Sequence, residues 1–317
     1  MRQIFVWICV AAIFSANGCK RQSHTGVSVD SSFRPFVPSN VVAISGVDFD
    51  ALRKTTLYQR HEAAIRAHGF DAMVERLGID PRRDVNKFLI VWNGKQPLVM
   101  VKGRFDQETI GTKLVSLGAT RTSYQEYTLF LQKNQPNQLA VGFIEGNLML
   151  AGPLASVQEA IEAHSNGLGG IPDVLKEDLE KLPADDQIWE VSRGPLLENI
   201  PLRQDVESAL SNIATYVSRT RAGFAVASGV RFDSEIICIS DAGAKRVRDA
   251  IRGSVGLARL ATNNNNLDLL RLWDAVKIAQ DGPIVDLSAD LAPDLADTLL
   301  ANASEFGKRA REELQQR

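Results

Sequence analysis

The sequence predicts an α+β protein with two similar tandem domains, each an antiparallel sheet with helices packed on one face. Strand-like and helix-like segments alternate along the chain, and the order found in the first half returns in the second. Two short matches support this repeat. Val41–Ser45 resembles Ile188–Ser192 at an offset of 147 residues, and Leu148–Leu150 resembles Val285–Leu287 at an offset of 137.

In the first half, β-rich runs alternate with segments that have helix caps and helical periodicity. Asp48 and Asp106 are placed to cap helices, Ser156 begins a capping box, and Asn93-Gly94 is a common hairpin turn. We therefore expect helices after these three caps. Strands are expected over residues 40–45, 88–92, 98–101, 127–131, 139–144 and 148–151.

The second half shows the same kinds of segment in the same order. Helices are expected over residues 195–217, through Val247 and Ile251, and from Pro293 onward, where proline suits a first helical turn. Strands are expected over residues 187–192, 224–229, 236–240, 275–279 and 284–287.

Composition divides the chain into five segments. Residues 1–18 are interpreted as a signal peptide and 19–37 as a lipidated cysteine with a flexible tether, because this stretch is rich in Ser, Gly and Pro. The two α+β domains are predicted over 38–165 and 183–317. Residues 166–182 contain a glycine-rich run and a helix, which we interpret as a hinge and bridging helix.

The N-terminus has the layout of an export signal. Arg2 precedes an apolar run from Ile4 to Phe14, and small residues follow up to Cys19. The apolar run has 11 residues, whereas a helix needs about 20 to cross a bilayer. We therefore predict a signal peptide and not a permanent membrane span.

The small residues before Cys19 resemble the lipobox of bacterial lipoproteins, and this resemblance covers residues 1–19 only. It implies that Cys19 receives a diacylglyceryl group, becomes the mature N-terminus and anchors the protein to a membrane. Lys20 stands where an Asp would resemble an inner-membrane retention signal, which favours an outer membrane facing the periplasm. Ordinary secretory cleavage after Gly18 is the alternative, since Ala16 and Gly18 also suit that enzyme.

The charge balance argues against a nucleic-acid partner. Without residues 1–18 the chain carries 35 Lys and Arg against 38 Asp and Glu, and it has no long basic stripe. The attraction to phosphates that dominates non-specific nucleic-acid binding therefore has no obvious source.

The candidates for catalysis or metal binding each have a simpler structural explanation. Cys238 lies in an apolar run typical of a buried thiol. His61 and His68 are seven residues apart, whereas zinc-protease helices place two histidines four apart. An acidic cluster at a strand end and helix start is interpreted as helix capping; its members are Asp286, Asp290, Asp294 and Asp297.

Two further motifs point to structure more than to ligand binding. Gly167–Gly170 lacks the lysine and hydroxyl residue of a phosphate-binding loop. Arg82-Arg83 could bind an anion, but Asp80 and Asp84 favour local ion pairs. We therefore predict no catalytic, cofactor-binding or metal-binding residues and no cofactor, and assign Cys19 alone as a functional residue.

These observations favour an exported, lipid-anchored envelope protein that acts as a non-enzymatic protein-interaction or assembly module. The expected partners are a membrane, through the lipid on Cys19, and another envelope protein. One alternative is a two-lobed binder of a small ligand, with a cleft around the glycine-rich joint. The other is a hydrolase that uses acidic residues.

Overall fold

The computed structural model describes residues 26–62, 74–75, 77–132, 138–144, 147–194 and 213–302. Its first half contains the strands β1 (Ala43–Asp48), β2 (Val85–Trp92), β3 (Pro97–Gly103), β4 (Ala119–Tyr124), β5 (Tyr127–Gln132), β6 (Leu139–Ile144) and β7 (Leu148–Pro153). The second half contains β8 (Ile188–Arg193), β9 (Val217–Val226), β10 (Val230–Cys238), β11 (Lys277–Asp281) and β12 (Ile284–Leu291).

Helices connect and cover these strands. The described helices are η1 (Arg34–Phe36), α2 (Phe49–Leu52), α3 (Thr56–His61), α5 (Pro81–Asp84), α6 (Gln107–Ser116), α7 (Leu154–Ser165), α8 (Asp173–Lys181), α10 (Asp241–Ala261) and α11 (Leu267–Ala275). The chain is helical again over residues 293–302. No helix in the described ranges is both long enough and apolar enough to span a membrane.

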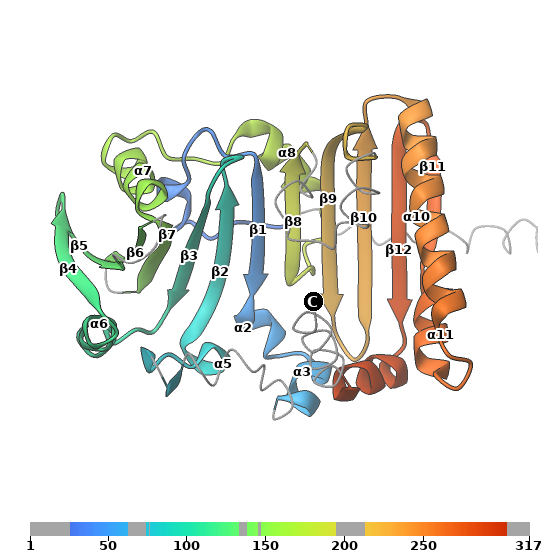
Figure 1. Cartoon of the computed structure of the whole chain (residues 1–317), viewed down its shortest axis with the longest axis horizontal. Helices are drawn as coiled ribbons and strands as arrows, with labels where there is room; N and C mark the ends of the chain where they lie inside the picture. Colours follow the sequence, from blue (N-terminus) through green and yellow to red (C-terminus); the bar gives the residue numbers. More distant parts are fainter. Residues whose placement is uncertain are drawn as a thin grey trace, which may run out of the picture.

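All described strands form one antiparallel sheet of twelve, in the order β11-β12-β10-β9-β8-β1-β2-β3-β7-β6-β5-β4 (Figure 1). The predicted α+β class is therefore confirmed. From the centre outward, the first half runs β1-β2-β3-β7-β6 and the second runs β8-β9-β10-β12-β11. The repeat seen in the sequence falls on equivalent strands, because its two matches involve β1 with β8 and β7 with β12.

The two halves are joined edge to edge at the centre of the sheet. β1 pairs antiparallel with β8, from Ala43 opposite Ser192 to Val47 opposite Ile188. A Cβ atom on Gly46 would lie 2.2 Å from Cζ2 of Trp189, so the indole packs directly on the backbone of β1. The boundary predicted between two domains thus separates two halves of one sheet.

Helices cover both faces of the first half. Met100 and Leu150 belong to a core with α7, whereas their neighbours Val101 and Met149 belong to a core with Ile110 of α6. Neighbouring strand residues point to opposite faces, so α6 and α7 lie on opposite sides of the sheet. The expectation that helices pack on one face only does not hold for this half.

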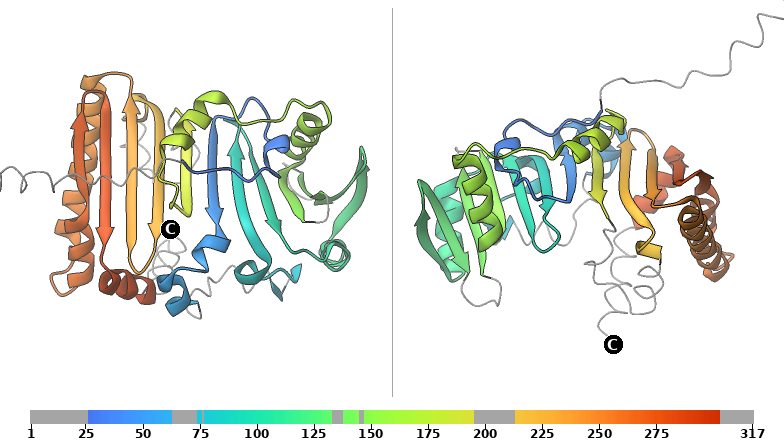
Figure 2. Two further views of the ribbon diagram at one scale, coloured as in Figure 1. Left: turned by 180° about the vertical axis from the view of Figure 1, so that it is seen from behind. Right: turned by 90° about the horizontal axis from the view of Figure 1, so that it is seen from above.

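In the second half, α10 packs on one face of the sheet. Val247 of α10 shares a small core with Ile236 and Val285, which are cross-strand partners on β10 and β12. Seen from above, α10 lies on the opposite side of the sheet from α7 and α8 (Figure 2).

Residues 26–37, which we call the strap, correct the prediction of a flexible tether. The strap runs across the sheet on the side of α7 (Figure 2). Val29, Phe33, Phe36 and Val37 are each at most 3% exposed. Asp30 accepts a hydrogen bond of 2.9 Å from Nζ of Lys102. The strap is therefore part of the core, and only residues 19–25 of the predicted tether lie outside the described residues.

The glycine-rich run predicted as a hinge is also packed. A Cβ atom on Gly169 would lie 1.7 Å from the carbonyl oxygen of Pro35, so only glycine allows this approach to the strap. The backbone N–H of Gly170 donates to the carbonyl of Val37 at 2.9 Å. The following helix α8 buries Leu175 and Leu179. These contacts fix residues 166–182 in place, which contradicts the hinge interpretation.

We predict that Gly46→Ala destabilises the protein by about 1–3 kcal/mol, because the added methyl group overlaps the rigid indole of Trp189. Urea unfolding of the full chain measures this change. Gly170→Ala is the matched control, since nothing lies within 4 Å of the added carbon. Equal stability of the two variants would show that the indole does not constrain this junction.

Candidate binding site at the α6 end of the sheet

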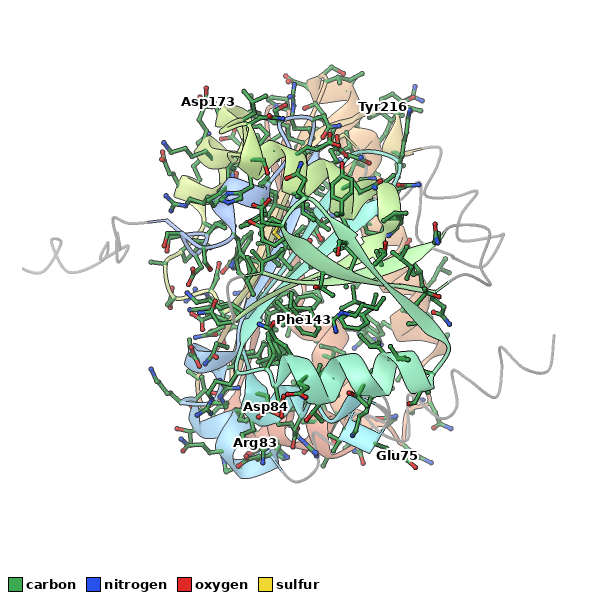
Figure 3. The ribbon with its side chains drawn as sticks, turned by 90° about the vertical axis from the view of Figure 1, so that its left-hand side faces the viewer. Glu75, Arg83, Asp84, Phe143, Asp173 and Tyr216 are labelled. Atoms are coloured by element: carbon green, nitrogen blue, oxygen red, sulfur yellow. The ribbon has the colours of Figure 1, made fainter. Side chains whose placement is uncertain are left out.

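Helix α6 lies across the outermost strands of the first half (Figure 3). Asp106 caps it by accepting hydrogen bonds from the backbone N–H of Thr109 at 3.1 Å and from its hydroxyl at 2.7 Å. These bonds to Thr109 hold the pKa of Asp106 below its usual range. Beyond the helix, Gly118 has a φ of +93°, a left-handed conformation that suits glycine and turns the chain into β4.

One close contact holds α6 to the sheet. A Cβ atom on Gly111 would lie 2.6 Å from Cζ of Phe130, so the helix backbone sits directly on this ring. Phe130 in turn meets Phe143 edge to face, with ring centroids 6.1 Å apart. The contact between Gly111 and Phe130 leaves open space on both sides of α6.

The first space, which we call the tip groove, adjoins the β4–β5 turn and has a volume of about 810 Å³. Phe130 and Phe143 line it together with Val115, which is 49% exposed. Figure 3 shows Phe143 between α6 and the β4–β5 hairpin. The polar residues of this groove are Gln107, Glu108, Thr112, Arg121, Glu126, Tyr127 and Thr128.

The second space, which we call the base groove, lies on the other side of Phe130 and has a volume of about 550 Å³. Its lining is mostly apolar and includes Leu77, Leu114 and Val141. Leu117 and Leu139 line it too and are 52% and 40% exposed. The two grooves place apolar side chains in contact with solvent, which is typical of a binding surface.

The β4–β5 hairpin beside the tip groove is anchored to α7. Its turn places Gln125 at a φ of +51°, the one positive value among the non-glycine residues described. Oγ of Ser165 donates to Oε1 of Gln125 at 2.5 Å, and the hydroxyl of Tyr124 donates to the carboxylate of Glu162. The hydrogen bond to Glu162 raises the pKa of Tyr124. These contacts hold the outer strand in position.

The residues singled out in the sequence are not brought together into one site. Cys19 and His68 lie outside the described residues. Cys238 is buried, and burial raises the pKa of its thiol, as expected for a core cysteine. Nε2 of His61 lies 2.7 Å from Oδ1 of Asp297.

The acidic cluster is divided among separate contacts. Asp294 accepts from Arg271 at 2.7 Å, while Asp297 pairs with Arg60 and His61. Asp286 lies on β12, where burial together with Glu235 raises its pKa. The hydrogen bond to Arg271 and, after it, a backbone hydrogen bond with Leu295 in the first helical turn lower the pKa of Asp294, so ion pairing is added to the predicted capping there. Within the described ranges, no group of three or more His, Cys, Asp or Glu residues could hold a metal ion.

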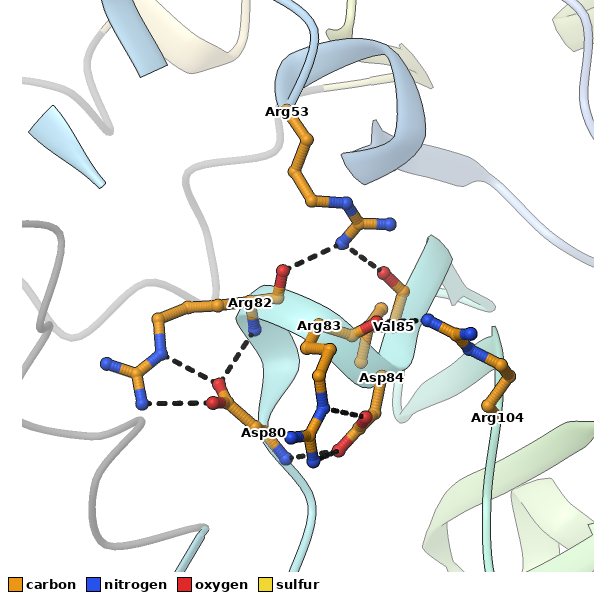
Figure 4. A network of polar contacts seen from close by, with 7 residues as sticks. All are labelled: Arg53, Asp80, Arg82, Arg83, Asp84, Val85 and Arg104. Carbon is orange, nitrogen blue, oxygen red and sulfur yellow. Dashed lines mark hydrogen bonds and ion pairs between the residues drawn. The ribbon is translucent and has the colours of Figure 1, made fainter. Parts of the chain in front are cut away.

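The local pairing predicted for Arg82-Arg83 is confirmed (Figure 4). Nε of Arg82 lies 2.7 Å from Asp80, and Nε of Arg83 lies 2.8 Å from Asp84. These arginines lower the pKa of both carboxyl groups. Arg53 donates to the carbonyl oxygens of Arg82 at 3.1 Å and Val85 at 2.8 Å, which ties α2 to the α5 turn.

A buried charge network in the second half was not predicted. Oδ1 of Asp186 accepts from Arg231 at 3.1 Å, while its buried Oδ2 has no hydrogen-bond partner among the described residues. A Cβ atom on Gly223 would lie 1.9 Å from this Oδ2. Burial raises the pKa of Asp186 to about 6. Nearby, the fully buried Asp178 accepts from Arg221 at 3.0 Å.

Comparison with known proteins gives a structural resemblance only. No protein-family model matches the chain, and no curated protein matches its sequence. Crystal form III of TP0453 is similar at a TM-score of 0.48 and 10% identity, over 86% of this chain and 99% of that one. Crystal form I has a TM-score of 0.45 and 9% identity, over 87% and 98%. Similarity at this level supports no conclusion about function.

We predict that Asp186 lowers stability as pH rises from about 4 to about 6. The neutral acid is favoured in the folded protein, because the folded pKa of about 6 exceeds the reference value of 3.8. At about 1.4 kcal/mol per pKa unit, the loss approaches ~3 kcal/mol. Unfolding free energies measured from pH 4 to 7 should therefore decline less in Asp186→Asn than in the unaltered protein.

Asp185→Asn is the control for this measurement, because Asp185 contacts the same Arg231 but its side chain is 62% exposed. That variant should keep most of the decline between pH 4 and 6, because burial raises the pKa of Asp186 more than the charge of Asp185 does. Identical pH profiles for Asp186→Asn and the unaltered protein would contradict the assignment of the raised pKa to Asp186.

Proposed function

We propose that this chain is an exported, lipid-anchored envelope protein that binds another protein at the α6 end of its sheet. The observation that carries the binding role is the pair of grooves beside α6. They share Phe130, and they are bordered by three large apolar side chains that are 40–52% exposed. An exposed apolar surface of this kind is typical of a protein-interaction site.

The anchor belongs to the same proposal and rests on residues 1–19. A lipid on Cys19 would attach the folded part to a membrane through residues 20–25, because the described part of the chain begins at Gly26. Diacylglyceryl modification supplies two acyl chains, and two chains give stable anchoring where one gives only marginal binding.

A small-ligand role is the second candidate, supported by the volume of the tip groove. About 810 Å³ falls within the range of small-molecule sites, and polar groups surround its aromatic floor. This site differs from the cleft between two lobes that the sequence predicts. The candidate groove lies within the first half, whereas β1 and β8 pair continuously at the centre where two lobes would need to separate.

We predict that Cys19→Ala prevents attachment of lipid to the chain. The thioether to lipid cannot form on alanine, so the protein should stay as an unprocessed precursor or become soluble. Fractionation with immunoblotting, together with the mass of the N-terminal peptide, measures this outcome. A diacylglyceryl adduct on Cys19 is expected in the unaltered protein, and a free Cys19 thiol on a soluble mature chain would rule out the anchor.

We further predict that a photo-crosslinking amino acid at Val115 captures a discrete protein partner in the native envelope. Leu257 of α10 is the control position, because it is also an exposed apolar residue, at 70%, and lies in the other half. The adduct should form at position 115 and be absent at 257. Labelling by a small molecule alone at position 115 would favour the ligand-binding alternative over the protein partner.

A further inference from the structure

Strand β4 forms one of the two ends of the described sheet, with β5 as its sole neighbour in the strand order. It has six residues, contains no proline and carries a single charge, on Arg121. An edge strand leaves one row of backbone N–H and C=O groups without strand partners, and these groups can pair with another chain.

The opposite edge strand, β11, is better protected. It has five residues, with Lys277 at one end and Asp281 at the other. A helix packs at each edge strand, α10 at β11 and α6 at β4, so the two terminal charges are what set β11 apart. Charges and covering helices are the usual protection of edge strands against pairing. The comparison therefore points to β4 as the edge available for strand addition.

Side-chain alternation on β4 directs it toward the tip groove. Arg121 pairs with Phe130 across the β4–β5 ladder, so both side chains point to the face covered by α6. Arg121 lines the tip groove, and no hydrogen bond or ion pair joins it to another described residue. Its guanidinium group is available for a carboxylate, which it can bind in a bidentate manner.

We propose that β4 receives an extended segment of the partner protein as an added strand, with an acidic side chain paired to Arg121. A neighbouring apolar side chain on the same face of the segment enters the tip groove against Val115 and Phe143. In strand addition, backbone hydrogen bonds supply affinity and pockets for alternate side chains supply specificity. This inference rests on the proposed function and defines the partner's chemistry at the same site.

Charge complementarity favours this occupant over a second copy of the chain. Two β4 strands paired antiparallel about their centres would bring their Arg121 side chains close together, and like charges across strands destabilise pairing. Glu108 and Glu126 also line the groove. They disfavour a second acidic side chain nearby, so the acidic position in the segment should be single and lie opposite Arg121.

The test uses the full chain in detergent and a displayed library of linear dodecapeptides. We expect selected peptides to share one acidic residue with an apolar residue two positions away, since alternate side chains share a face. Hydrogen exchange should slow in residues 119–124 when peptide binds. Arg121→Glu should weaken binding about tenfold or more, and replacing the peptide's acidic residue by Lys should restore it.

Lys277→Glu on β11 is the matched charge reversal and should leave affinity unchanged. Thermal unfolding of each variant confirms that it folds. As a second test, Val115→Asp at an exposed position of the tip groove should also weaken peptide binding. Failure to select any peptide, exchange protection elsewhere, or binding of dodecanoate in place of peptide would overturn the proposal. A partner that still crosslinks at position 115 in Arg121→Glu would overturn strand addition but leave the proposed function intact.

Discussion

The antiparallel pairing of β1 with β8 is the constraint on which the rest of the structure depends. Each of these strands begins its half, and each half then adds strands outward in the same order. The pairing requires Gly46, because Trp189 occupies the space that any larger side chain would need. Trp189 also belongs to the largest core, together with Phe33 of the strap and Leu175 of α8. The junction therefore links the two halves, the strap and helix α8 in one packed unit.

The strap shows why this arrangement is hard to recognise in the sequence. Its buried side chains are interrupted by polar residues and one proline, Pro35, which gives no helical or strand periodicity. They are buried because the sheet supplies a surface, as when Phe36 stacks on His164 of α7 with centroids 4.3 Å apart. The glycine run of residues 167–170 is similar, since its close contact with Pro35 exists only in the folded chain. Composition alone suggested flexibility in both segments.

The strands rich in aliphatic side chains were predicted well, and β6 has the predicted bounds. β4 was missed because Ala119–Tyr124 is almost wholly polar, and this edge strand pairs with only one neighbour. The candidate site depends on β4, so it could not be predicted either. Gly111 inside a predicted helix was the one sequence feature that could have indicated the site, because an interior glycine often marks a close approach of the backbone. Its partner Phe130 is distant in sequence, and only the fold brings the two together.

The grooves arise where the two halves depart from their shared plan. After the third strand of each half, the first half inserts α6, β4 and β5, whereas the second half inserts α10 and α11. Helix α10 has 21 residues and follows the strands beneath it (Figure 1), while α6 has 10. Because α6 crosses the strands, it covers each strand of about 20 Å only over the width of one helix, about 10 Å. The two added strands widen the sheet while the helix is shortened, so apolar surface remains open on both sides of α6. The strands common to both halves form the scaffold, and the insertion that differs between them supplies the surface suited to recognition.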